Sequence, residues 1–358
     1  NAVIERKGAK TCFITTSGFR DVLDIGYESR FDQYDILIDK TMSLVPRKHR
    51  YVIDERTDVN GSIITSINKD QFYNLINKIK NENFESIAVG FLHSYANPEN
   101  EKILKAFLTK ELPDVEVSVS SDVCPEIREY ERFTTTVVNA YIKPLMSNYL
   151  KKLDQKLLNS GFNCPLLLMT SGGTLTNISS ACNNPVRLVE SGPAGGAILA
   201  TSIAEDMNLS KVISFDMGGT TAKITIIENK KAIKAREFEV DRKARFKKGS
   251  GYPLRIPVIE MVEIGAGGGS IARVNKLEQI ITGSDSAGSF PGPACYSNGG
   301  SMPTITDADL VIGKINPDNF AGGKIKLSKQ LADKAITENI VKFVNIDTNI
   351  AALAISEI

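Results

Sequence analysis

The stretch Phe215-Asp216-Met217-Gly218-Gly219-Thr220-Thr221 joins two apolar runs, residues 212–216 and 223–227. An Asp at the end of one strand, followed by two glycines and two threonines before the next strand, predicts a hairpin with an anion-binding turn. Adjacent glycines let consecutive backbone N–H groups face one concavity, and a carboxylate there can hold a Mg²⁺-bound water. The alternative is an ordinary Gly-Gly hairpin. No Gly-Lys-Ser/Thr follows, so the turn is not a Walker A loop.

Two more glycine-rich stretches lie near predicted strands. Ser191-Gly192-Pro193-Ala194-Gly195-Gly196 follows a predicted strand, residues 186–190, and opens a predicted helix; its small residues suit either an anion or close helix packing. Gly265-Ala266-Gly267-Gly268-Gly269-Ser270 fails the dinucleotide spacing, because Ser270 stands at the third glycine. A backbone loop approaching a ligand is a better interpretation than a plain flexible loop, so Gly267, Gly268 and Gly269 are candidate cofactor-binding residues.

Strands and helices alternate along the chain, which predicts an α/β fold. Phe72, Leu75, Ile76 and Ile79 keep the spacing of an amphipathic helix, residues 87–92 read as a buried strand, and a longer helical pattern covers residues 137–158. At about 150 residues per domain, the length favours two domains. We place the division at the charged run 126–132, giving domains 1–132 and 133–358. Such a run is usually a solvated helix face.

Composition excludes several classes of function. The 358 residues carry a net charge of +1, which argues against a nucleic-acid binder, and no apolar run reaches the about 20 residues of a membrane helix. The five cysteines are scattered and there are two histidines, so a disulfide framework or a zinc site is not expected. The cysteine pattern suits a reducing cytoplasm. His93 reads as structural, and Cys295 lacks a nearby His to act as a nucleophile.

Several stretches together resemble the hydantoinase A/oxoprolinase family, which includes N-methylhydantoinase large subunits, 5-oxoprolinases, and acetone and acetophenone carboxylase subunits. Besides the three glycine-rich stretches, the resemblance rests on Thr15-Thr-Ser-Gly-Phe-Arg-Asp, Phe91-Leu-His-Ser-Tyr-Ala-Asn-Pro, Pro125-Glu-Ile-Arg-Glu-Tyr-Glu-Arg, Pro291-Gly-Pro-Ala-Cys-Tyr and Thr306-Asp-Ala-Asp-Leu. These stretches run almost from end to end of the chain. They are specific for the family and poorly specific within it.

The resemblance implies an actin/sugar-kinase/Hsp70-like ATPase fold with ribonuclease-H-like domains, incomplete at both ends, as in an internal fragment. It implies ATP and Mg²⁺ as cofactors, with Asp216 holding the metal through water as the catalytic carboxylate. Gly218 and Gly219 would then cradle phosphate, while Thr220 and Thr221 donate to it. The particular metal ligands stay open.

The activity implied by the resemblance is ATP-dependent hydrolysis of a cyclic amide, of hydantoin or 5-oxoproline type, by an A-type subunit. A B-type companion subunit and an oligomer are expected, with no nucleic-acid or membrane partner. Two alternatives stay open. One is a subunit of an acetone- or acetophenone-type carboxylase, and the other is an inactive fragment that only binds a partner subunit.

Overall fold

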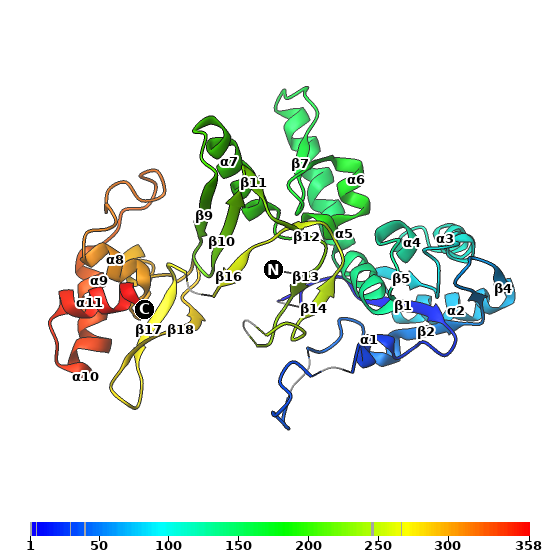
Figure 1. Cartoon of the computed structure of the whole chain (residues 1–358), viewed down its shortest axis with the longest axis horizontal. Coiled ribbons are helices and arrows are strands. Elements are labelled where there is room, and N and C mark those ends of the chain that lie inside the picture. Colours follow the sequence, from blue (N-terminus) through cyan, green and yellow to red (C-terminus); the bar gives the residue numbers. More distant parts are fainter. Residues whose placement is uncertain (1, 5, 29, 39–40, 245–246, 266) are drawn as a thin grey trace. The chain divides into compact units, whose positions relative to one another are not determined.

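The computed structural model describes residues 2–4, 6–28, 30–38, 41–244, 247–265 and 267–358 (Figure 1). The chain forms two compact units. Unit 1 comprises Asn1–Ile198 and Lys234–Ile259, and unit 2 comprises Leu199–Ile233 and Glu260–Ile358. Helix α5, Glu129–Asn159, runs across the position of the predicted domain division. The predicted boundary at residue 132 therefore does not coincide with the boundary between the two compact units. The division into domains 1–132 and 133–358 stays a prediction.

Unit 1 is built on a parallel sheet in the order β2-β1-β5-β6, formed by Arg50–Ile53, Thr11–Thr16, Ser86–Gly90 and Glu116–Val119. All residues of β1 and β5 are buried, as expected for a parallel sheet covered on both faces. The alternating side chains of β1 point to different layers. Cys12 and Ile14 pack in one core cluster, and Phe13 packs in another.

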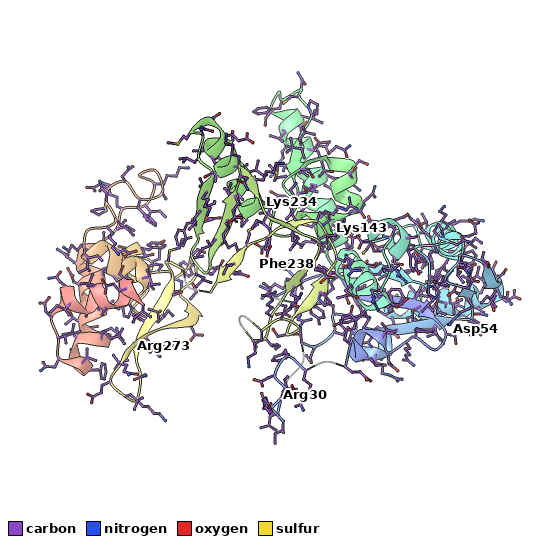
Figure 2. All side chains as sticks on the ribbon, viewed as in Figure 1. Arg30, Asp54, Lys143, Lys234, Phe238 and Arg273 are labelled. Atoms are coloured by element: carbon purple, nitrogen blue, oxygen red, sulfur yellow. The ribbon has the colours of Figure 1, made fainter. Side chains whose placement is uncertain are left out.

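Helices cover both faces of this sheet (Figure 1). Helices α2, Lys69–Glu82, and α3, Glu99–Glu111, pack against Cys12 and Ile14. Helix α3 contributes Leu104 and Leu108, and α2 contributes the predicted apolar stripe of Phe72, Leu75, Ile76 and Ile79. The long helix α5 covers the Phe13 side with Phe133, Val137 and Ala140. Lys143 extends from α5 to β6 (Figure 2), where its Nζ donates to the carbonyl of Val117 at 3.1 Å.

Shorter elements complete unit 1. The helical segments are α1 (Val22–Ile25), η1 (Arg47–His49), α4 (Ser120–Val123), α6 (Ile178–Asn183) and η2 (Pro185–Leu188). The strand pairs are β3 (Arg56–Thr57) with β4 (Ile63–Thr65), β7 (Leu167–Met169) with β8 (Leu175–Asn177), β12 (Lys234–Ala235) with β15 (Val258–Ile259), and β13 (Phe238–Val240) with β14 (Tyr252–Leu254).

Unit 2 begins within helix α7, Ser191–Asp206, and contains a small antiparallel sheet. Its strands are β9 (Lys211–Met217), β10 (Ala222–Glu228), β11 (Lys231–Ala232) and β16 (Val262–Ile264), and a second hairpin is formed by β17 (Ser270–Val274) and β18 (Ile280–Ser286). A helical cluster follows, with η3 (Ala294–Tyr296), α8 (Ile305–Val311), α9 (Lys329–Ile336), the π-helical η4 (Thr337–Val341), α10 (Lys342–Val344) and α11 (Thr348–Glu357). Ala308, Ile336, Ala352 and Ile355 lie in its core.

Two local expectations were wrong. Residues 186–190 form no strand; η2 occupies Pro185–Leu188, where Pro185 at the first position suits a helical turn. The charged run 126–132 is not wholly a solvated helix face, because Glu131 and Arg132 are buried at the start of α5. Within the described part of the chain, every helix is too short or too polar to cross a bilayer.

Candidate functional site

The predicted hairpin is present in unit 2. Strands β9 and β10 pair antiparallel with Asp216 opposite Lys223, and the turn is closed by the Gly218 N–H, which donates to the Thr221 carbonyl at 2.9 Å. Asp216 is exposed at the end of β9. The sequence folds this way because two apolar strands flank two glycines that close the turn without side chains.

The glycine-rich loop 265–269 packs directly on this turn. The Gly268 N–H donates to the Gly218 carbonyl at 3.0 Å, and the Gly269 N–H donates to the Gly219 carbonyl at 2.8 Å. A Cβ at Gly267 would lie 2.6 Å from the Thr220 nitrogen and 2.7 Å from the Gly218 oxygen. Glycine at this position therefore permits a backbone-to-backbone approach that other residues would block. Ala266 lies outside the described residues.

This packing fixes the direction of the turn's amides. In a trans peptide the C=O of one residue and the N–H of the next point in opposite directions. Because the Gly218 and Gly219 carbonyls accept hydrogen bonds from the glycine loop, the Gly219 and Thr220 N–H groups point away from it. Neither amide donates to any acceptor within the described part of the chain, and both residues are exposed. Two such amides beside two threonine hydroxyls suit an anion.

Helix α8 holds the glycine loop in place. The Thr306 hydroxyl donates to the Gly268 carbonyl at 2.8 Å. Its neighbour Asp307 is fully buried and accepts from the N–H groups of Thr304 at 2.9 Å and of Cys295 at 2.7 Å. The glycine loop, η3 and α8, which are far apart in the sequence, thus form one supporting structure behind the turn.

A row of charged residues crosses the sheet beside the turn. Lys223 on β10 lies opposite Asp216 on β9 and opposite Glu263 on β16. Burial lowers the pKa of Lys223, and the Glu263 carboxylate, 3.9 Å from its Nζ, acts in the opposite direction. The register therefore places one cation between two carboxylates. Sequence analysis missed Lys223, although a lone Lys within an apolar strand was a signal that could have found it.

The other candidates have different surroundings. The stretch 191–196 forms the first turns of α7, and a Cβ at Gly192 or Gly196 would meet nothing within 4 Å, so close packing on described residues does not explain these glycines. Cys295 is fully buried, and burial followed by the charge of Asp307 raises the pKa of its thiol. A thiol that stays protonated is a poor nucleophile.

Two family models match the chain. The Hydantoinase/oxoprolinase model matches residues 132–358, and the model of the Hydantoinase/oxoprolinase N-terminal region matches residues 1–112. The chain belongs to the hydantoinase/oxoprolinase family. This confirms the resemblance drawn from the motifs, and the hairpin turn, the glycine loop and α8 all lie within residues 132–358 of this family member.

Several known proteins match this family member over nearly the whole chain. An uncharacterized protein of Methanocaldococcus jannaschii is 44% identical over 92% of the chain and 49% of its own length. Caprolactamase subunit alpha of Pseudomonas jessenii is 33% identical over 99% of the chain and 50% of its own length, and the crystal structure of that ATP-dependent caprolactamase gives a TM-score of 0.76. The nucleotide-free structure of acetone carboxylase gives a TM-score of 0.81 at 27% identity, covering 98% of this chain and 50% of that one. The chain thus spans about half the length of these relatives.

Proposed function

We propose that this chain is part of an A-type subunit that hydrolyses a cyclic amide, of hydantoin or 5-oxoproline type, in an ATP-dependent reaction. An amide carbon is a poor electrophile, and transfer of the ATP γ-phosphoryl group to the amide oxygen would make that carbon attackable by water. The name of a 33% identical relative, caprolactamase subunit alpha, supports hydrolysis of a cyclic amide. The observation that carries the proposal is the pair of outward-facing amides at Gly219 and Thr220.

The residues of the turn fit a nucleotide phosphate. The Gly219 and Thr220 N–H groups have no acceptor within the described residues, and Thr220 and Thr221 add two hydroxyl groups at the same turn of the chain. Gly218 closes the turn, Gly268 and Gly269 hold its carbonyls on the other side, and Gly267 permits the close approach of the loop. Hydrogen-bond donors that already point at the phosphate stabilise the charge of the transition state, because they do not have to reorient during phosphoryl transfer.

Magnesium fits the same place by its coordination chemistry. Mg²⁺ keeps several waters and takes one or two carboxylates together with substrate phosphates. Asp216 offers one exposed carboxylate at the end of β9, and the described residues contain no cluster of three or more His, Cys, Asp or Glu side chains that could hold a metal. Asp216 would hold the ion through water, and the ion would supply neutralisation of phosphate charge.

We assign the chain to the actin/sugar-kinase/Hsp70-like ATPase fold as part of this proposal. A Gly-Gly-Thr-Thr turn between antiparallel strands in unit 2, and helices on both faces of the sheet in unit 1, are in keeping with ribonuclease-H-like domains. The relatives named as subunits support a B-type companion subunit and an oligomer. Free, scattered cysteines support a cytoplasmic location.

A carboxylase subunit is the second candidate function. The higher TM-score belongs to acetone carboxylase, whereas the higher sequence identity belongs to caprolactamase. Both reactions would use the same turn, so the turn does not separate them. Substrate-dependent phosphate release by the full-length protein separates the two reactions. A hydrolase should release phosphate when a cyclic amide is added, whereas a carboxylase should release it only when a ketone and bicarbonate are added.

Two substitutions in the full-length protein test the turn. Asp216→Ala should abolish ATP-dependent turnover with little change in the free energy of unfolding, because its exposed carboxylate contacts metal and phosphate rather than the core. Gly219→Ala should weaken ATP binding and leave the fold intact, because a Cβ there meets no described atom within 4 Å but stands beside the phosphate-binding amides. ATP titration and thermal melts measure the two effects. Near-normal turnover in Asp216→Ala would show that the assignment is wrong.

The chain of residues 1–358 has its own expected outcome. In-line phosphoryl transfer needs every phosphate-binding element in place, and losing a single preorganised donor typically costs a factor of about 100 to 1,000. Because the relatives are about twice as long, we expect this chain alone to release phosphate from ATP at no more than background rate. Steady release that disappears in Asp216→Ala would show instead that the chain is a complete catalytic unit.

A further inference from the structure

A cavity of about 540 Å³ lies within unit 1 and has no part in the proposed reaction. Its described lining residues belong to α1 and the residues after it, to the start of α5, to β13 and β14, and to residues 248–251 before β14. The volume lies in the range of small-molecule sites, about 300–1,000 Å³. The charged run 126–132, which was expected to be a solvated helix face, contributes Glu131 to the wall.

The charges of the described lining residues are unbalanced. Its lining residues include five carboxylates and one ammonium group, namely Asp24, Glu28, Glu131, Glu237, Glu239 and Lys248. Two of the carboxylates have strong partners of their own. Arg50 donates to both oxygens of Asp24 at 2.7 Å, and Arg242 lies 3.2 Å from Glu239. The deficit of positive charge therefore falls on the remaining carboxylates.

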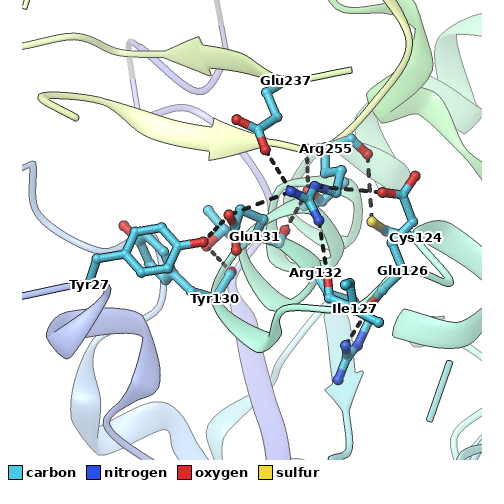
Figure 3. Close-up of polar contacts among 11 residues, drawn as sticks. Tyr27, Cys124, Glu126, Ile127, Tyr130, Glu131, Arg132, Glu237 and Arg255 are labelled. Atoms are coloured by element: carbon cyan, nitrogen blue, oxygen red, sulfur yellow. Dashed lines mark hydrogen bonds and ion pairs between the residues drawn. The ribbon is translucent and has the colours of Figure 1, made fainter. Parts of the chain in front are cut away.

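Arg255 is shared among three carboxylates at this wall (Figure 3). Its Nη2 lies 2.6 Å from Glu237 and 3.8 Å from Glu131, and its Nε lies 3.6 Å from Glu126. One guanidinium with a single positive charge thus faces three negative charges. The shortest contact goes to Glu237, which leaves Glu131 the least compensated of the two that line the cavity.

Glu131 has an unmet hydrogen-bonding need. The residue is only 5% exposed; Oε1 accepts from the Tyr27 hydroxyl, and Oε2 has no partner among the described residues. A buried carboxylate oxygen without a donor is costly, so native proteins rarely leave one. Tyr27, which donates to Oε1, is itself 56% exposed and belongs to the loop after α1.

Aromatic rings surround the same carboxylate. Tyr27 and Tyr130 meet edge to face with ring centroids 5.5 Å apart, and Tyr252 also lines the cavity. Burial, and then the hydrogen bond to Glu131, raises the pKa of Tyr27, which therefore stays a neutral donor. Tyrosine faces attract organic cations. A metal ion fits less well, because the described residues offer no cluster of three or more suitable ligands.

We propose that this cavity binds a small organic cation that carries a primary ammonium group, which donates to Oε2 of Glu131 beside Tyr27 and Tyr130. The cation would supply the missing positive charge and the missing donor together. The tyrosine rings would contact its alkyl part and its charged end. This site is independent of the proposed hydrolase activity, since it needs neither ATP nor the turn at Gly218 and Gly219.

Isothermal titration of the chain with n-butylammonium, in the absence of ATP, tests the proposal. The neutral probe 1-butanol has nearly the same shape and should not bind. Glu131→Gln should weaken n-butylammonium binding by about tenfold or more, since a hydrogen bond to a charged group is lost. The matched control Glu205→Gln changes an exposed carboxylate on α7 and should leave binding unchanged.

Tyr27→Phe gives a second and opposite test. It keeps the ring but removes the hydroxyl that now donates to Glu131, so n-butylammonium should bind several-fold more tightly. This exposed substitution keeps the test decisive if Glu131→Gln fails to fold. The proposal is overturned if the chain does not bind n-butylammonium, if 1-butanol binds equally well, or if neither variant changes the affinity in the stated direction.

Discussion

A single glycine, Gly267, determines how closely the glycine loop approaches the turn at Gly218 and Gly219. A methyl group at this position would lie 2.6 Å from the Thr220 nitrogen, which is closer than atoms pack. We expect Gly267→Ala to lower the free energy of unfolding by about 1–3 kcal/mol, as overpacking typically does. Gly196→Ala is the control, because that helical position is open and alanine should stabilise it by about 0.5–1 kcal/mol. Urea unfolding measures both, and equal effects of the two substitutions would contradict the packing argument.

Glu55 is a buried carboxylate whose protonation should couple to stability. Burial raises its pKa from the usual 4.5, although it accepts from Thr16 and, at 2.8 Å, from Asn100. A raised folded-state pKa means that the folded chain holds this proton more tightly than the unfolded chain does. The resulting stability is fully present below the unfolded pKa and is lost as the pH rises through the folded pKa.

Glu55→Gln should therefore remove this pH dependence. Relative to the wild type, the variant should gain free energy of unfolding between pH 4.5, the usual pKa of this group, and about pH 7.5. Urea unfolding at both pH values gives the difference. A gain that is the same at both values, or that falls towards higher pH, would show that Glu55 is not held in its protonated form by burial.

At the scale of elements, the sequence predicts the helices and strands that follow from hydrophobic spacing. It misses the turns and buried side chains that depend on tertiary contacts. The stripe of Phe72, Leu75, Ile76 and Ile79 gives α2, and the apolar runs around the Gly-Gly turn give β9 and β10. The apolar run 186–190 resembles a strand but lies in a short helical turn, because Pro185 begins one. Burial of Arg132 could not be predicted from the charged run, since two of its partners, Phe91 and Tyr95, come from a distant segment.

Arg132 anchors the start of α5 to the end of β5. It is fully buried, its Nη2 donates to the Phe91 carbonyl at 3.1 Å and its Nη1 to the Glu126 carbonyl at 2.8 Å, and its guanidinium lies over Tyr95. Arg132→Lys keeps the charge but cannot donate in two directions from a planar group, so we expect a loss of about 2 kcal/mol or more.

The matched control for this anchor is Lys152→Ala, an exposed position on the same helix, which should change stability by less than about 0.5 kcal/mol. Thermal melts of both variants measure the difference. A loss of similar size in both would mean that α5 responds to substitution in general, rather than through the anchor at Arg132.

At the scale of the whole molecule, the sequence shows which stretches carry the family motifs, but it does not show how these stretches contact one another in the fold. The family follows from the order of its motifs, and the turn at Gly218 follows from its residue types. The contact of Gly268 with that turn, supported by Thr306, depends on loops that are separated by tens of residues along the chain and have no periodic pattern. The same holds for Glu131, whose partners Tyr27 and Arg255 lie far from it in the sequence.

The surface of β9 should make the chain of residues 1–358 self-associate. Among the described residues β9 pairs only with β10, so its other edge is open, and Ile213, Phe215 and Met217 on one face are 69%, 60% and 42% exposed. An open edge beside an exposed apolar face is a template for pairing with another chain. Sedimentation velocity over a range of concentrations should show dimers or larger species.

The substitution Phe215→Lys tests whether β9 is the associating surface. Burying a Phe side chain contributes about 1.5–3 kcal/mol, and a two-fold symmetric contact buries it twice, so Phe215→Lys should weaken association at least a hundredfold. Leu277→Lys, an equally exposed apolar position at the β17–β18 turn, should have no effect. A monomer at every concentration, or equal dissociation by both lysine variants, would show that β9 is not the associating surface.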